Sequence, residues 1–298
     1  MDGLDSTQLR TLAAVVSEGS FEAAGRLLHV TPSAVSQRIK ALEETVGQVL
    51  VRRQRPCDAT EAGRPLLRLA GQLALLEREA LADARGPLGG DPGRTRVAVV
   101  VNADSLATWF PAALARLPAR PELSFDIRQD DQDHTAELLR DGVVTAAVTA
   151  QREAVQGCRV RPLGAMRYRA LAAPSLADRW FADGLTPAAA GAAPVVVFDR
   201  KDQIQHRFLR TLTGRTLDPP VHYVPSVPAF NESIQLGLGW GLVAERIADA
   251  DLAAGNCVDI APGRVLDVPL YWQHWRLDSQ VLNALTAAVC AVAADSLR

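Results

Sequence analysis

The chain has 298 residues, of which 48% are hydrophobic and 22% are charged, and its formal net charge at pH 7 is −2. This length is too great for one small domain, and the composition excludes a disordered or fibrous protein. Four widely separated cysteines without a Cys-x-x-Cys pair argue against structural zinc, and we expect no metal or other cofactor. Because no secretory signal and no apolar run of membrane-spanning length is present, we expect a cytoplasmic protein with no membrane partner.

The first 30 residues predict two amphipathic helices that share a small core. Apolar residues recur at helical spacing over 4–16 and again over 21–29. Ser20 is the expected N-cap of the second helix. The chain then breaks at Val30, where Thr31 can cap a third helix and Pro32 suits its first position, which needs no amide donor.

The third helix has two different faces. Val35, Ile39 and Leu42 recur at core spacing, and the opposite face carries hydroxyls, an amide and cations. Such groups read base edges and hold phosphates in a DNA major groove, although an ordinary solvated surface helix is the alternative. The residues predicted to meet DNA here are Thr31, Pro32, Ser33, Ser36, Gln37, Arg38 and Lys40.

The segment after this helix has the form of a wing. A short apolar strand at 49–51 leads into Arg52, Arg53 and Arg55, followed by Pro56 and a polar return to Thr60. Residues 22–55 include six cationic and three acidic side chains, although the whole chain is slightly acidic. Local positive charge of this kind is expected of a surface that binds DNA.

The segment from Phe21 to Glu44 resembles the winged helix-turn-helix of LysR-type transcriptional regulators. The resemblance implies an α/β protein with a DNA-binding domain (1–60), a dimerising linker helix (61–87) and a two-lobed effector domain of the periplasmic-binding-protein type (94–298). Lobe I would comprise about 94–163 and 268–298, and lobe II about 164–267. The implied partners are double-stranded promoter DNA, a small-molecule effector, further copies of the chain in a homodimer or homotetramer, and RNA polymerase as a possible contact.

Three further segments, 101–109, 131–134 and 270–272, resemble the LysG/ArgP branch of this family. Members of that branch sense basic amino acids and control a basic amino acid exporter. The resemblance therefore implies that lysine or arginine is the effector and that an exporter gene is the target.

The predicted linker helix carries apolar residues near heptad spacing, which are Leu66, Leu69, Leu73, Leu76 and Ala80. A single helix packed on its own domain is one interpretation. Pairing with a second copy is favoured, because a long helix between two domains should find little of its own chain to cover its apolar face. The turn formers from Arg85 to Arg94 then mark a linker.

Beyond the linker, strands and helices alternate, which predicts parallel sheets with helices on their faces. The expected lobe I elements are strands 95–101, 123–127 and 146–149 and helices 106–117 and 135–140. A second unit is expected from strands 168–172, 194–198, 222–224 and 240–243 and helices 204–212 and 231–237, and a strand at 266–275 and a helix at 279–296 return to lobe I. A ligand should then bind between the lobes, at the carboxyl ends of the strands.

Polar residues follow several of these strands and form the candidate effector site. They are Asn102, Asp104, Ser105, Asp130, Asp131, Asp133, Thr149 and Asp199. The acidic run at 130–133 could bind the cationic end of lysine or arginine, or be a hydrated loop in which Asp133 caps the next helix. Asp104 could take the α-ammonium group, or cap a helix that starts at Ser105.

No sequence motif supports catalysis. The chain has no Gly-x-Ser-x-Gly, no His-Glu-x-x-His and no dinucleotide-binding glycine pattern in a strand context, so we expect no enzyme. The alternative to a regulator is a cytosolic solute-binding or enzymatic α/β domain with an N-terminal helical module for protein contacts. Salt-dependent DNA binding distinguishes the two.

Overall fold

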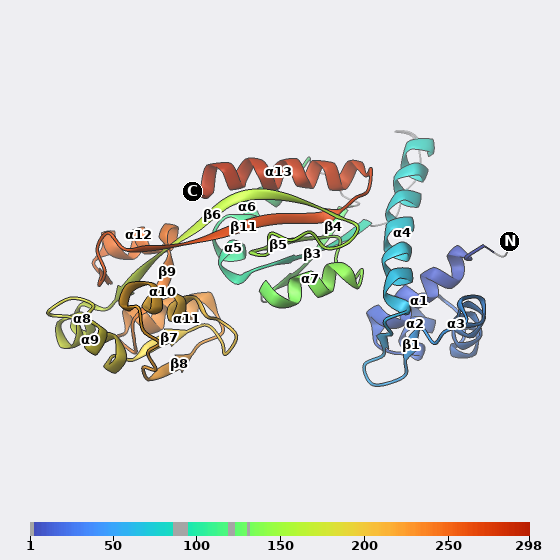
Figure 1. Ribbon diagram of the computed structural model, residues 1–298. Coiled ribbons are helices and arrows are strands. Elements are labelled where there is room, and N and C mark those ends of the chain that lie inside the picture. The colour runs from blue at the N-terminus through green and yellow to red at the C-terminus, as the bar shows by residue number, and fades with distance from the viewer. Residues whose placement is uncertain (1–2, 86–94, 119–122, 130–131) are drawn as a thin grey trace.

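The computed structural model describes residues 3–85, 95–118, 123–129 and 132–298. Its N-terminal domain packs helices α1 (Ser6–Glu18), α2 (Phe21–Leu27) and α3 (Pro32–Val46) around a core that includes Leu12, Ile39 and Leu42. The short strands β1 (Val51–Arg52) and β2 (Asp58–Ala59) pair antiparallel and form the wing (Figure 1). This domain is the expected winged helix-turn-helix.

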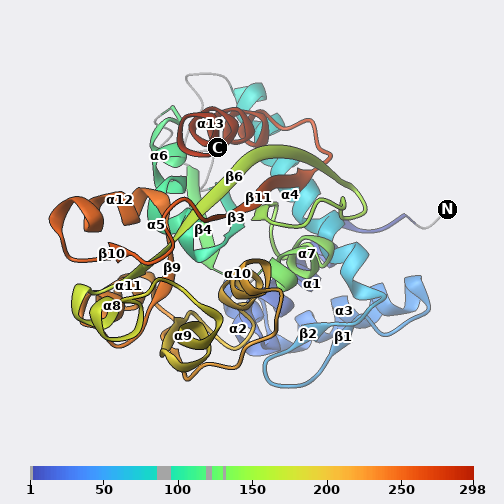
Figure 2. The ribbon, with the colours of Figure 1, turned by 60° about the vertical axis from the view of Figure 1, so that its left-hand side comes forward.

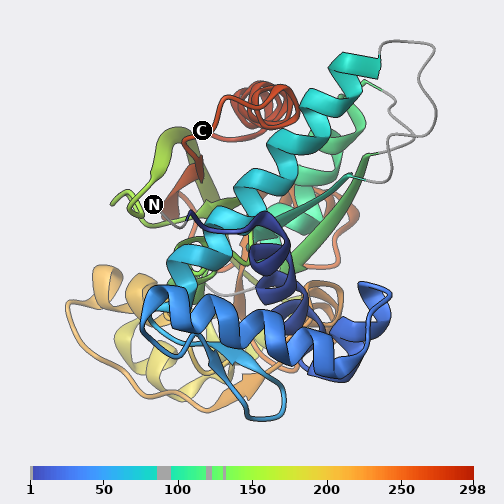
Figure 3. The same ribbon diagram turned by 90° about the vertical axis from the view of Figure 1, so that its right-hand side faces the viewer.

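Helix α4 (Gly63–Arg85) leaves this domain and lies along the effector domain (Figure 3). Arg64 pairs with Asp141 at 3.2 Å, and a Cβ added to Gly71 would meet the Trp275 ring at 2.8 Å. Near its end, the Glu79 carboxylate accepts hydrogen bonds from the Ser279 hydroxyl at 2.6 Å and the Val281 amide at 3.1 Å. The chain itself therefore covers one face of this helix, whereas Leu76 and Ala80 of the predicted apolar positions are exposed.

Two lobes make up the effector domain. In lobe I the parallel strands β3 (Thr95–Val101), β4 (Leu123–Gln129) and β5 (Ala146–Thr149) lie in the order β5-β3-β4. Helices α7 (Gln132–Arg140) and α13 (Gln280–Ser296) lie on opposite faces of this sheet (Figures 1 and 2). The remaining helices of lobe I are α5 (Ala103–Thr108) and α6 (Phe110–Ala115).

Lobe II contains the shorter strands β7 (Val195–Val197), β8 (Val221–Tyr223), β9 (Gly241–Ala244) and β10 (Val258–Asp259). Its helices are α8 (Pro174–Trp180), α9 (Pro187–Ala192), α10 (Ile204–Thr213), α11 (Val227–Gln235) and α12 (Glu245–Ala254). The long antiparallel strands β6 (Cys158–Ala172) and β11 (Val265–Trp275) run through both lobes and connect them (Figure 1). The predicted α/β fold class, with its N-terminal helix-turn-helix, is confirmed.

Several predicted elements need correction. The helix expected over 106–117 is divided into α5 and α6, because Pro111 lacks the amide that would continue the first helix. The strand expected at 168–172 extends back to Cys158, and helices α8, α9 and α12 were not predicted. Helix α5 begins at Ala103 with Asn102 as N-cap, so Asp104 does not cap a helix that starts at Ser105.

None of the helices in the described part of the chain combines the length and hydrophobicity of a membrane span. Within the same residues, no three histidine, cysteine, aspartate or glutamate side chains are grouped closely enough to hold a metal ion.

Candidate functional site

The turn between α2 and α3 is held by the caps that the sequence predicts. The Ser20 hydroxyl accepts a hydrogen bond from the Ala23 amide at 3.1 Å, and the Thr31 hydroxyl accepts one from the Ala34 amide at 3.2 Å. A Cβ added to Gly25 would lie 2.8 Å from the Val30 carbonyl oxygen, so the turn packs directly on α2. Caps and close packing together fix the direction in which α3 leaves the turn.

Helix α3 buries one face and presents the other to solvent. Val35, Ile39 and Leu42 are buried in the core of the domain. Two of the α3 residues predicted to meet DNA, Ser36 and Arg38, are half-buried. The other residues predicted to meet DNA here are exposed: Thr31, Pro32, Ser33, Gln37 and Lys40. The polar face is therefore free to enter the major groove of DNA, which is wide enough to admit an α-helix.

The wing lies beside α3 and adds positive charge (Figure 3). The Glu43 carboxylate of α3 accepts a hydrogen bond from the Leu50 amide at 2.8 Å, which fastens the wing to the helix. Arg52, Arg53 and Arg55 are exposed, and the Arg53 guanidinium lies 5.1 Å from the centre of the Phe21 ring. In the part of the chain that the structure describes, none of these three arginines forms an ion pair.

Replacing Gln37 with alanine should relax the sequence preference of DNA binding. Gln37 is exposed near the N-terminal half of α3, where a side-chain amide can pair with a base edge. We expect a loss of about 1–3 kcal/mol at the contacted base pair, with binding to random DNA nearly unchanged. Competition binding with a set of operator variants measures this. Wild-type preference at every base pair would contradict the assignment.

A cavity of about 380 Å³ lies between the two lobes. Its lobe I wall comes from the ends of β3 and β4 and the start of α5, and its lobe II wall from β6 and from the loops around α10 and α11. The polar and charged lining residues are Asn102, Asp104, Gln129, Tyr168, Asp199, Lys201, Asp202, Gln203, Gln205 and Arg207.

Asp104 is a strongly perturbed carboxylate in this cavity. Its carboxylate accepts a hydrogen bond from the Tyr168 hydroxyl at 2.7 Å. Burial raises the pKa of Asp104 to about 6, the Tyr168 hydrogen bond opposes this rise, and the charge of Asp202 adds to it. Tyr168 pairs with Ala244 of lobe II, so this hydrogen bond joins the two lobes across the cavity.

Asn102 adds an unsatisfied acceptor on the same wall. It is the N-cap residue of α5, but its side chain makes no capping hydrogen bond. Its Oδ1 atom is buried and has no partner among the described residues. An unpaired buried acceptor beside a buried carboxylate would be relieved by a ligand that donates hydrogen bonds, such as an ammonium or guanidinium group.

The segment from Asp199 to Arg207 forms the facing wall. Asp199 accepts a hydrogen bond from the Lys201 amide at 2.7 Å, and Asp202 accepts one from the Ile204 amide at 2.9 Å. Burial raises the pKa of Asp202 as well. These carboxylates shape the loop that places Lys201 and Arg207 at the cavity, where a cation can bind a carboxylate group.

The predicted effector residues fall into three groups. Asn102, Asp104 and Asp199 line the cavity. Ser105 is fully buried and does not line it, and neither does Thr149, whose hydroxyl accepts a hydrogen bond from the Gln151 amide at 3.1 Å instead. Asp130 and Asp131 lie outside the described residues, as does the side chain of Asp133. Because α7 begins at Gln132, Asp133 is inside the helix and is not its N-cap.

Sequence reasoning missed Tyr168, Lys201 and Arg207. Tyr168 lies in the middle of a long strand, and a single tyrosine there reads as a packing residue. The two cations follow a three-residue strand and read as ordinary surface charge. For Lys201 the available signal was its position just after a predicted lobe II strand, the same relation to the cleft that selected Asp104, whereas Arg207 lies inside α10.

Comparisons with known proteins agree with this architecture. Residues 6–64 match the model of the bacterial regulatory helix-turn-helix protein of the lysR family, and residues 89–293 match the LysR substrate binding domain. The lysine export transcriptional regulatory protein LysG of Corynebacterium glutamicum is 43% identical over 301 residues, covering 99% of this chain and 100% of the relative.

Solved structures extend the likeness to three dimensions. The crystal structure of ArgP from Mycobacterium tuberculosis has a TM-score of 0.89 at 50% identity, with 99% of each chain covered. Full-length LysG from Corynebacterium glutamicum with bound effector Arg has a TM-score of 0.79 at 41% identity, covering 99% of this chain and 100% of that one. These relatives are regulators rather than enzymes, and the match over residues 6–64 favours DNA binding over a module for protein contacts. The chain therefore belongs to the LysR family of bacterial transcriptional regulators, and within it to the LysG/ArgP type.

Proposed function

We propose that this regulator senses lysine or arginine in the cavity between its lobes and controls the gene of a basic amino acid exporter. The buried Asp104 carboxylate, next to the unpaired Oδ1 atom of Asn102, is the observation that carries the proposal. The relative that shares 41% identity was solved with arginine bound as its effector, and the 43% identical relative is named for lysine export.

The charges of the cavity suit a basic amino acid better than a neutral or acidic one. Three carboxylates, those of Asp104, Asp199 and Asp202, line it together with the cations Lys201 and Arg207. The lining thus has one more acid than cations. An amino acid with a cationic side chain carries two positive groups and one carboxylate, so its net positive charge complements the lining. In a partly desolvated cavity each such contact is charge-assisted, so a neutral side chain cannot replace it.

The proposal assigns DNA binding to the polar face of α3 and to the wing arginines, with double-stranded promoter DNA as the partner in the cytoplasm. Helix α4 leaves Leu76 36% exposed and Leu81 51% exposed, although much of its apolar surface is covered within the chain. We infer that these leucines contact a second copy in a homodimer or homotetramer. Contact with RNA polymerase would follow from binding at a promoter.

Thermal-shift screening of the full chain with the standard amino acids tests the effector. A ligand that binds only the folded state raises the melting temperature as its concentration exceeds the dissociation constant. Arginine or lysine should raise the melting temperature and leucine should not. A rise with leucine, or no rise with either basic amino acid, would refute the proposal.

Effector binding should depend on pH through Asp104. A cationic effector binds the ionised carboxylate, whereas the empty site takes up a proton as the pH falls through about 6, the pKa to which burial raises this group. Affinity should therefore fall about tenfold between pH 8 and pH 5, and Asp202, whose pKa is also raised, would add to the loss. Titrations from pH 5 to pH 8 measure this. The Asp104→Asn variant is the control, and its affinity should change far less over this range.

A further inference from the structure

The two long strands that connect the lobes are interrupted at one point. Along β11, Leu270 pairs with Gly164 of β6, but the next residue, Tyr271, pairs with Pro162, so that Leu163 has no partner in the ladder. Gly164 has a φ of +120°, which disfavours any side chain. Such a β-bulge bends a strand pair locally, and this one, which we call the pivot, lies where β6 and β11 pass from lobe I to lobe II.

The residues that follow α13 dock on this pivot. The Ala165 amide donates to the Arg298 carbonyl at 2.8 Å, and the Arg298 amide donates to the Ala165 carbonyl at 3.0 Å. A Cβ added to Gly164 would lie 2.8 Å from the Arg298 carbonyl oxygen, so glycine permits the close approach. The backbone of Arg298 is thereby fixed at the pivot, directly after a helix of lobe I.

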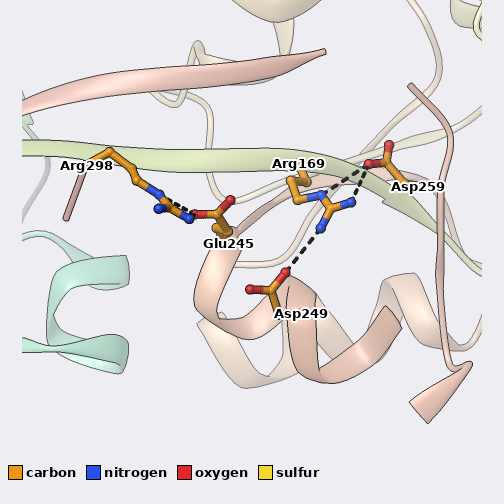
Figure 4. Close-up of polar contacts among 5 residues, drawn as sticks. All are labelled: Arg169, Glu245, Asp249, Asp259 and Arg298. Carbon is orange, nitrogen blue, oxygen red and sulfur yellow. Dashed lines mark hydrogen bonds and ion pairs between the residues drawn. The ribbon is translucent and has the colours of Figure 1, made fainter. Parts of the chain in front are cut away.

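The side chain of Arg298 continues to lobe II. Its Nη2 and Nε atoms lie 2.8 Å and 3.0 Å from one carboxylate oxygen of Glu245, the first residue of α12 (Figure 4). A bidentate pair, in which Arg167 donates to both carboxylate oxygens of Asp267 at 2.8 and 2.9 Å, joins β6 and β11 close by. Arg167 lowers the pKa of Asp267, and the charge of Arg298 contributes to that shift.

Helix α12 is attached firmly to lobe II. Arg169 of β6 binds Asp249 of α12 at 3.1 Å and Asp259 of β10 at 3.0 Å (Figure 4). One guanidinium thus ties the helix, the edge strand and the connecting strand together. Glu245 is therefore expected to move together with the rest of lobe II and not with α12 alone.

We propose that the Arg298–Glu245 pair is a latch between the lobes that stabilises their closed arrangement. This arrangement is closed because residues of both lobes line one cavity and the Asp104–Tyr168 hydrogen bond crosses it. Rotation of lobe II about the bulge would move Glu245 relative to α13, the lobe I helix that directly precedes Arg298. The latch itself is independent of the ligand, whereas its effect on effector affinity rests on the proposed function.

The distance between the lobes in the full chain without effector tests the latch. Spin labels at Ala287 of α13 and Asp178 of α8, in a background with Cys290→Ser, report this distance by electron double resonance after dilution into unlabelled protein. Arg298→Ala and Glu245→Gln should broaden the distance distribution relative to the otherwise unchanged protein. The double variant Arg298→Glu with Glu245→Arg should narrow it again.

Arg116→Ala is the matched control, because Arg116 pairs with Asp295 of α13 at 2.9 Å entirely within lobe I. Its distribution should equal that of the unchanged protein. If Arg298→Ala leaves the distribution unchanged, or if Arg116→Ala broadens it equally, the latch is refuted.

Affinity for arginine gives a second readout. Both latch variants should bind it about two- to fivefold more weakly, the range expected for breaking a largely exposed ion pair, and the charge exchange should restore the affinity. If the unchanged protein binds no arginine, the proposed function fails. The spin-label distances between the lobes still test the latch in that case. Arginine binding that Arg298→Ala does not weaken would contradict the latch even where the proposed function holds.

Discussion

Replacing Asp104 with asparagine should weaken arginine and lysine binding about 100-fold. The carboxylate is partly buried in the cavity and accepts a hydrogen bond from Tyr168, so a bound cation would lose its charge partner in a partly desolvated site. Removing one member of a buried charge pair costs about 2–5 kcal/mol, which corresponds to a factor of about 30 or more in affinity. Asparagine preserves the shape of the side chain and can still accept a hydrogen bond from Tyr168. The loss of affinity therefore measures the contribution of the negative charge of Asp104.

Equilibrium dialysis with labelled arginine measures this change. Asp178→Asn is the control, because Asp178 is an exposed residue of α8 that does not line the cavity, and the variant should bind arginine like the unchanged protein. DNA binding without effector should be unaltered in both variants. Undiminished arginine binding by Asp104→Asn would remove Asp104 from the site and would leave the acidic run at 130–133 as the predicted partner of the cation.

Replacing Arg52, Arg53 and Arg55 together with alanine should weaken binding to every DNA sequence by about 10- to 100-fold at moderate salt. The three guanidinium groups are exposed on one short turn, which suits contact with phosphates or with a narrow minor groove. Each lost phosphate contact should also reduce the slope of log affinity against log salt by roughly one. Sequence preference should change little, in contrast to Gln37→Ala.

The matched control replaces the same three residues with lysine. Lysine keeps the charge but not the planar fork of the guanidinium, so the salt slope should remain close to that of the unchanged protein. Fluorescence anisotropy over a range of salt concentrations gives both quantities. An unchanged slope in the alanine variant would mean that the wing is a solvated loop and not a DNA contact.

The DNA-binding domain could be predicted in detail because its signals are local. Ser20, Thr31 and Pro32 each determine a helix start within four residues of themselves, and the structure places all three at helix starts. The spacing of Val35, Ile39 and Leu42 determines which face of α3 is buried. Local rules of this kind need no knowledge of the rest of the chain.

The effector cavity could be predicted only in part because it depends on topology. Asn102 and Asp104 were found because they follow the first strand of lobe I, where a doubly wound sheet opens. Tyr168 reaches the same cavity from the other lobe, because β6 crosses the pivot and brings its hydroxyl to within 2.7 Å of Asp104. No sequence pattern states that these residues, 64 positions apart, meet across a cleft.

The docking of α4 is another contact that periodicity cannot reveal. Its apolar spacing was interpreted as a surface for a second copy. Leu76 and Ala80 of that spacing are exposed, but Leu66, Leu69 and Leu73 pack against the core of the DNA-binding domain. Glu79, an unremarkable acid on the helix, caps the start of α13 from 200 residues away. The N-terminal amides of a helix attract a carboxylate from any part of a chain, so only the fold determines which one arrives.

Calorimetric titration of the full chain with arginine, lysine and norleucine tests most directly whether the cavity senses a basic amino acid. Norleucine has the same carbon chain as lysine without the terminal ammonium group, so it isolates the contact attributed to the acidic lining. We expect saturable binding of arginine or lysine and at least tenfold weaker binding of norleucine. Equal binding of lysine and norleucine, or no binding of either basic amino acid, would contradict it.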